Sequence, residues 1–92
     1  MNKRITIYVY GRVQGVFYRF HTKRKAKSLN LRGWVKNQDD GGVKILAEGK
    51  KQDLETFLLW CRRGPPFAKV NNISHEWTNI ASDKFDSFKI KY

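Results

Sequence analysis

The 92-residue chain has one cysteine, two prolines and no long apolar run. A single cysteine cannot form an internal disulfide, so we expect a reducing, cytoplasmic setting rather than a disulfide-stapled secreted domain. No apolar segment approaches the ~20 residues that span a bilayer. The opening stretch "MNKRITIYVYG" alternates in polarity instead of forming an apolar signal core. We therefore expect no membrane partner.

Acidic residues are also scarce, with 8 Asp and Glu against 19 Lys and Arg, a formal net charge of +11. Such a surplus favours anionic partners, whether nucleic acid, phosphorylated metabolites or acidic surfaces. Most of the basic residues are expected to form solvated faces. The His, Cys, Asp and Glu residues show no metal-ligand spacing, so no metal site and no cofactor are predicted. Without repeats or linkers, residues 1–92 are expected to form a single domain, and the small size and high charge favour a monomer.

The order of the sequence periodicities predicts a fold. "ITIYVY" alternates like a half-buried strand, whereas residues 20–29 have helical spacing. "LRGWVKN" and "GVKILAEG" flank the turn signal "DDG" and predict a hairpin. Residues 51–64 form an amphipathic helical pattern, and two extended segments cover residues 68–77 and 85–92. The sequence therefore predicts an α+β, ferredoxin-like βαββαβ sandwich with a short extra strand, in which two helices cover one face of a mostly antiparallel sheet.

The loop "GRVQGVFYR" (11–19) joins the first strand to the first helix. Such a glycine-bearing loop either only turns the chain or aims backbone N–H groups into a hollow that binds phosphate. Arg19 would add a bidentate cation. Val13 stands where a Cys-x5-Arg phosphate cradle would have its thiolate, so water would have to attack directly. With no acid nearby to assist departure, the substrate needs a good leaving group, as in a carboxylic–phosphoric anhydride.

"GRVQGVFYR", followed by "GWVKNQDDGGV" (33–43), resembles the two signature motifs of the acylphosphatase family, and the likeness extends through "AEG" (47–49) and "GPPFAKV" (64–70). The resemblance implies the same fold and the hydrolysis of small acyl phosphates without metal or cofactor. Arg19 resembles the family's substrate-binding arginine, and Asn37 the asparagine that positions water. The resemblance also implies a phosphoryl group bound by the backbone N–H groups of Gln14, Gly15, Val16, Phe17, Tyr18 and Arg19. Inorganic phosphate, the product, is expected to inhibit competitively.

Two positions depart from the family pattern. Tyr18 stands where members usually have Phe, and Asn30 replaces a frequent glycine. The alternative function is an RNA-binding module of the same βαββαβ order, because "IYVYG" resembles the first-strand motif of such modules. These modules need stacking aromatics on the third strand, and "GVKILAEG" has none. Nucleic acid is therefore an unlikely partner. Cys61 is expected to be a core thiol, and Asp39 and Asp40 are expected to make the hairpin turn.

Overall fold

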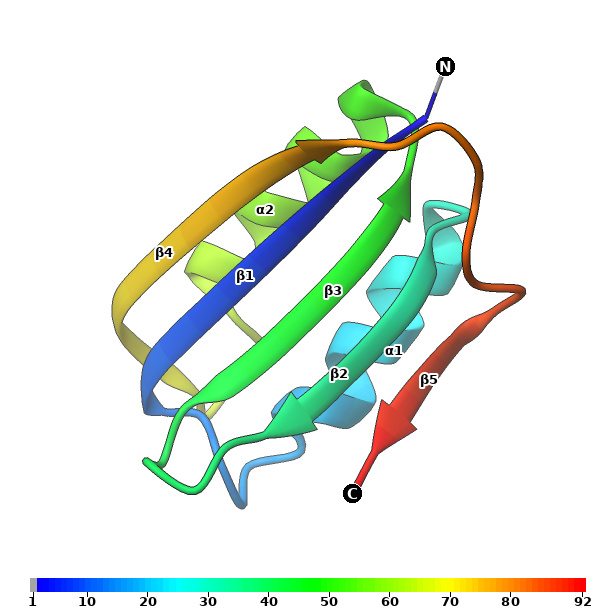
Figure 1. Ribbon diagram of the computed structural model, residues 1–92. Helices are drawn as coiled ribbons and strands as arrows, with labels where there is room; N and C mark the ends of the chain where they lie inside the picture. Colours follow the sequence, from blue (N-terminus) through cyan, green and yellow to red (C-terminus); the bar gives the residue numbers. More distant parts are fainter. Residues whose placement is uncertain (1) are drawn as a thin grey trace.

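The computed structural model describes residues 2–92, and it contains one five-stranded sheet with both helices on the same face (Figure 1). The elements run in the order β1 (Lys3–Arg12), α1 (Tyr18–Ser28), β2 (Arg32–Asn37), β3 (Val43–Gly49), α2 (Lys51–Arg63), β4 (Lys69–Asn79) and β5 (Phe88–Lys91). The predicted ferredoxin-like α+β fold is confirmed, including the short final strand.

The strand order β4-β1-β3-β2-β5 determines which loops meet. β3 pairs antiparallel with both β1 and β2, so β1 and β2 run in the same direction. β5 pairs parallel with β2 and therefore ends at the same edge. The loop that leaves β1, the end of β2 and the end of β5 thus lie close together, although 72 residues separate Arg19 from Lys91 along the chain.

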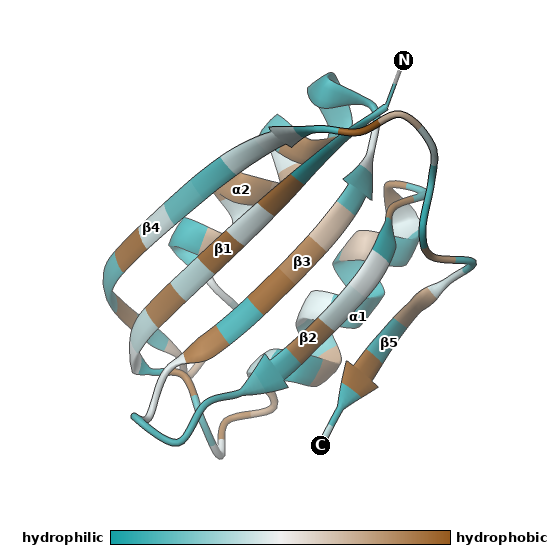
Figure 2. Cartoon of the chain, in the orientation of Figure 1, coloured by the Kyte–Doolittle hydropathy of each residue, from teal (hydrophilic) through white to brown (hydrophobic). Residues whose placement is uncertain are grey.

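The core lies between the sheet and the helices. Strand residues of alternate positions point toward the helices and are buried, as the alternating hydropathy along β1 shows (Figure 2). α1 contributes Tyr18, Thr22 and Ala26, and α2 contributes Leu54, Phe57 and Cys61. The fully buried side chains include Ile5, Ile7, Val9, Val35, Ile45, Leu54, Phe57 and Cys61. Cys61 is therefore a core thiol, as expected.

The ends of several elements differ from their predicted positions. α1 begins at Tyr18, two residues before the predicted start, and Asn30 follows it in the left-handed conformation (φ 58°), as the family's glycine would. β4 continues to Asn79 because its pairing with β1 continues to Lys3. Within residues 2–92, no helix is both long and apolar enough to cross a membrane.

Candidate active site

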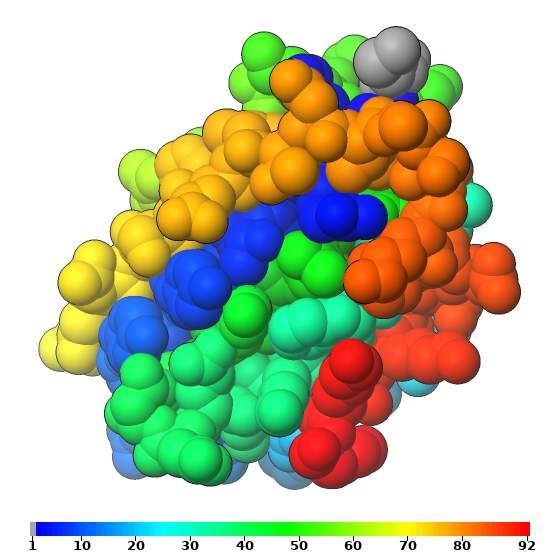
Figure 3. All heavy atoms as spheres, in the orientation of Figure 1, coloured from blue at the N-terminus to red at the C-terminus, as the bar shows by residue number. Residues whose placement is uncertain are grey.

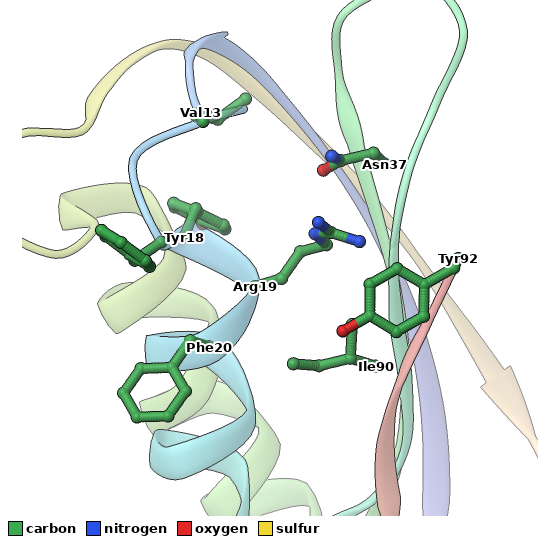
Figure 4. A pocket seen from close by; sticks show the side chains of 9 residues that line it. Val13, Tyr18, Arg19, Phe20, Asn37, Ile90 and Tyr92 are labelled. Carbon is green, nitrogen blue, oxygen red and sulfur yellow. The ribbon is translucent and has the colours of Figure 1, made fainter.

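The three strand ends that meet at one edge of the sheet surround a hollow of about 320 Å³ (Figure 4). It contains Arg19 and Asn37, the two side chains singled out from the sequence. The lining residues are Val13, Gly15, Phe17, Tyr18, Arg19, Phe20, Asn37, Ile90 and Tyr92. Of the predicted phosphate loop, Gln14 and Val16 are not among them. The fold thus brings together a loop, a strand end and the C-terminal strand around one cavity.

The loop before α1 has the backbone geometry of an anion site. Gly15 (φ 74°) and Phe17 (φ 62°) are both left-handed, a conformation that costs a non-glycine residue about 1–2 kcal/mol. Phe17 begins α1 without a side-chain cap, and the first turn holds no acidic residue. Among residues 2–92, no acceptor receives a hydrogen bond from the backbone N–H groups of residues 14–20. Unpaired N–H groups at a helix N-terminus attract an anion.

Arg19 extends from the first turn of α1 into the hollow. Its Nη1 donates a long hydrogen bond of 3.4 Å to the Lys91 carbonyl, and its Cζ lies 4.9 Å from the centre of the Tyr92 ring. Within the described residues, no carboxylate lies within 4.0 Å of the guanidinium. Because a guanidinium has five N–H donors, most of them stay available to a ligand.

Asn37 is the last residue of β2, and its amide group points toward the Arg19 guanidinium (Figure 4). Its Oδ1 is buried and accepts no hydrogen bond from any residue between 2 and 92. Buried polar atoms are almost always paired with protein or ordered water, so an unpaired one inside a cavity points to a ligand. The amide is suited to hold a small polar molecule next to the arginine.

The Gln14 side chain connects the phosphate loop to the hairpin after Asn37. Its Nε2 donates to the Gln38 carbonyl (2.8 Å) and to the Gly42 carbonyl (2.9 Å). These bonds fix the distance between the loop and the end of β2. From the sequence, only the backbone of Gln14 was expected to contribute. Its two acceptors lie 24 and 28 residues further along the chain, so no local sequence pattern predicts that the Gln14 side chain connects these two segments.

Tyr18, the departure from the family pattern, packs in the core next to the site. Its hydroxyl donates a 2.9 Å hydrogen bond to the Cys61 carbonyl near the end of α2. Burial raises the pKa of the Tyr18 phenol, and it also raises the pKa of the Cys61 thiol. Both groups therefore stay protonated at neutral pH. The Tyr18 hydroxyl is therefore hydrogen-bonded to the Cys61 carbonyl, and this bond connects the start of α1 to α2.

Two other residues near the loop serve packing. A Cβ at Gly11 would lie 2.1 Å from the Lys69 carbonyl oxygen, so this glycine permits the close pairing of β1 and β4 rather than shaping the cradle. Asp40 accepts hydrogen bonds from the Gly42 N–H (3.0 Å) and the Tyr10 hydroxyl (3.0 Å), consistent with the expected turn role. The bond to Asp40 raises the pKa of Tyr10.

Three lining residues were not predicted from the sequence: Phe20, Ile90 and Tyr92. Ile90 and Tyr92 reach the hollow only because β5 pairs with β2 in parallel. Phe17, at 77% exposure, and Tyr92, at 93%, give the hollow an exposed aromatic rim. No hydrophobic periodicity predicts which distant strand will pair at an edge, so Ile90 and Tyr92 carried no usable signal, whereas Phe20 directly follows Arg19 in the sequence and could have been found from it.

Within residues 2–92, the ferredoxin-like domain thus places a loop with unpaired N–H groups opposite an arginine and an unpaired amide oxygen. The family model for acylphosphatase matches residues 5–90. An acylphosphatase from Methylococcus capsulatus is 51% identical over 71 residues, 77% of each chain. One from Thermotoga petrophila is 47% identical over 98% of each chain. The crystal structure of acylphosphatase from Bacillus subtilis has a TM-score of 0.92 and 41% identity, covering 98% of this chain and 99% of that one. The chain belongs to the acylphosphatase family and is an acylphosphatase enzyme.

Proposed function

We propose that the hollow at the end of β1, β2 and β5 hydrolyses the carboxyl–phosphate bond of small acyl phosphates. Arg19 and the backbone N–H groups of residues 14–19 hold the phosphoryl group, and Asn37 orients the attacking water. The observation that best supports this assignment is the buried Asn37 Oδ1, which has no partner among residues 2–92 and lines the same hollow as Arg19.

The reaction needs no covalent intermediate. The water oxygen forms a bond to phosphorus while the bond from phosphorus to the acyl oxygen breaks, and the carboxylate leaves with that electron pair. The water's proton passes to a phosphoryl oxygen, because the Asn37 amide does not act as a base at neutral pH. Val13 offers no nucleophile, so water attacks phosphorus directly. Charge spreads over the equatorial phosphoryl oxygens in such a loose transition state. Those oxygens would face Arg19 and the loop N–H groups, which act by electrostatic stabilisation.

The test is hydrolysis of acetyl phosphate by the wild type and by Arg19→Ala and Asn37→Ala. Arg19 holds the phosphoryl group in both the ground state and the transition state, so its loss raises KM and lowers kcat, and we expect kcat/KM to fall about 10³-fold. Asn37 orients water, so its loss lowers kcat about 10²–10³-fold with KM nearly unchanged. The matched controls are Arg63→Ala on α2 and Asn72→Ala on β4, which are exposed and lie outside the hollow.

Wild-type inactivity toward acyl phosphates would overturn the proposal as a whole. Full activity in Asn37→Ala, with normal folding by circular dichroism, would overturn the role given to the amide alone. A rise in KM without a fall in kcat for Asn37→Ala would instead make it a substrate-binding residue. The KM and kcat of each variant thus separate the two roles.

We also propose that inorganic phosphate competes with the acyl phosphate for the loop and Arg19. An inhibition constant that rises about tenfold or more in Arg19→Ala would support this competition, because the arginine supplies a charge-assisted, bidentate contact. Residues 1–92 are proposed to act as a single, monomeric domain in the cytoplasm. Sedimentation analysis at assay concentrations tests the monomer, and cell fractionation tests the location.

A further inference from the structure

No helix covers the face of the sheet opposite α1 and α2, but the segment between β4 and β5 packs over one end of it (Figure 1 and Figure 3), where the Lys84 and Phe85 N–H groups donate to the buried Glu48. The rest of this face carries aromatic and basic side chains. The register places Tyr8 opposite Lys44, Lys36 opposite both Lys44 and Lys91, and Trp34 opposite Lys89. All of these alternate with buried core residues and therefore point away from the helices. We call this group the open-face patch: Tyr8, Trp34, Lys36, Lys44, Lys89 and Lys91.

Rings and ammonium groups alternate across four neighbouring strands of the patch. Lys44 on β3 lies between two rings, with its Nζ 5.4 Å from the centre of the Tyr8 ring on β1 and 5.9 Å from the centre of the Trp34 ring on β2. Lys91 on β5 places its Nζ 4.7 Å from the Trp34 ring. Within residues 2–92, none of the four patch lysines lies within ion-pair distance of a carboxylate. Their charge is therefore available to an anion.

Trp34 lines two surface hollows. One is lined by Trp34, Lys36, Asn37, Gln38, Asp39 and Lys44. The other is lined by Gly33, Trp34, Lys84, Phe85, Asp86, Ser87, Lys89, Ile90 and Lys91. Each hollow offers the indole ring together with at least two lysines and only one carboxylate. A ligand with planar rings and regularly spaced negative charges would match both features.

We infer that the open-face patch binds single-stranded nucleic acid, a function separate from acyl phosphate hydrolysis. Bases stack on Tyr8 and Trp34, which lie two strands apart and two residues out of register, about 12 Å. The lysines beside the rings neutralise phosphates. The sequence argued against such a partner because the third strand has no aromatic residue. The structure changes that premise, since Trp34 on β2 lies beside Lys44 of β3 and supplies the second ring.

Single strands fit the patch better than other anionic polymers. A duplex hides the faces of its bases, so it could use the lysines but not the rings. An acidic peptide would likewise leave Tyr8 and Trp34 without planar partners. The patch adjoins the hydrolytic hollow, and Asn37 and Ile90 lie between the two. Its rings and lysines nevertheless point to the open side of the sheet, whereas the buried Val35 points to the helix side of β2.

The test is fluorescence anisotropy of a labelled twelve-nucleotide thymidine strand, with a duplex of equal charge for comparison, over a range of salt concentrations. We expect the single strand to bind more tightly than the duplex. Trp34→Ala should weaken single-strand binding about 5–150-fold, the range for losing one stacked base. Lys44→Gln should reduce the slope of log K against log salt by about 0.7.

Matched controls separate the patch from net charge and from catalysis. Trp77→Ala removes an indole on the opposite face of the sheet, since Trp77 pairs with the buried Ile5, and it should leave binding intact. Lys27→Gln also removes one positive charge, but from the exposed side of α1, away from the patch. It should weaken binding far less than Lys44→Gln. Tyr8→Ala removes a ring that does not line the hydrolytic hollow, so it should weaken strand binding and leave acyl phosphate hydrolysis intact.

Equal affinity for duplex and single strand would overturn the inference and leave only charge attraction. Wild-type affinity of Trp34→Ala for the single strand would also overturn the inference. An equal loss of affinity in Lys27→Gln and Lys44→Gln would do the same. If Trp34→Ala does not fold, Tyr8→Ala and Lys44→Gln carry the test, because both side chains are half-buried on the open face and neither belongs to the core. Absence of any single-strand binding at low salt would refute the inference outright.

Discussion

The buried hydroxyl of Tyr18 offers a sharp test of how the site is supported. Tyr18→Phe removes one oxygen, leaves the ring in place and restores the residue that acylphosphatases usually carry. In this structure the hydroxyl is the donor to the Cys61 carbonyl at 2.9 Å, and both residues are buried. Removing it leaves that carbonyl without this partner in a region closed to water. We therefore expect destabilisation, although the substitution restores the usual residue.

The magnitude follows from the loss of one hydrogen bond without a cavity. A typical intramolecular hydrogen bond contributes about 0.5–1.5 kcal/mol, and leaving a buried acceptor unpaired costs about 1–3 kcal/mol. We expect a loss of about 1–2 kcal/mol. For a domain of this size, 1 kcal/mol lowers Tm by about 4–8 °C, so the Tm of Tyr18→Phe should fall by roughly 5–15 °C.

The assay is urea and thermal unfolding of the wild type, Tyr18→Phe and Tyr10→Phe. Tyr10→Phe removes the same oxygen, but from an exposed hydrogen bond to Asp40. The Tm of this variant should therefore stay within a degree or two of the wild type. Because the pKa of Tyr18 is raised in the folded state, its stabilising effect is complete below about pH 10, the ordinary tyrosine value. It declines as the pH rises above that value, since the unfolded chain then ionises first. A Tyr18→Phe protein as stable as the wild type would refute the reasoning.

Three further perturbations test the same structure. Gln14→Ala frees the phosphate loop from the Gln38 and Gly42 carbonyls, so kcat for acyl phosphate hydrolysis should fall at least about tenfold when measured well below the Tm of the variant; an unaltered kcat would contradict the positioning role. Glu48→Gln removes the buried charge that faces the partly exposed Arg4 and should cost about 1–3 kcal/mol in urea unfolding, the range for hydrogen bonds to charged groups; an unchanged stability would contradict a stabilising contact. Cys61 should resist thiol reagents in the native protein and react in urea, because burial raises the pKa of its thiol.

The elements that the sequence predicted correctly are those with strong local periodicity. Leu54, Phe57 and Cys61 follow a helical spacing and are buried, and the alternation of "ITIYVY" marks the buried side of β1. The two signature motifs also marked Arg19 and Asn37, which the fold brings to one hollow. Such features depend on neighbours within one element or one motif, so a local pattern is sufficient to find them.

The features that the sequence did not reveal depend on pairing between distant strands. The parallel pairing of β2 with β5 places Tyr92 beside Arg19, and the order β1-β3-β2 places Lys44 between Tyr8 and Trp34. Strand order and register are tertiary properties, and one residue of slip would turn each side chain to the other face. Polar residues at such junctions, including Gln14, therefore gain their partners only when the sheet is assembled.

The start of α1 combines several features that folding alone would not favour. Arg19 places a cation at the positive end of the helix dipole, Phe17 takes a left-handed conformation, and the helix begins without a side-chain cap. Each of these features costs free energy in the absence of an anion. A bound phosphoryl group offsets the cost of the Arg19 cation and the cost of the missing cap. Sites that bind or react commonly concentrate such costs, whereas the rest of the fold supplies the stability. The sheet core beneath the loop, closed by Val13 and the Tyr18 hydrogen bond, is what holds this unfavourable arrangement in place.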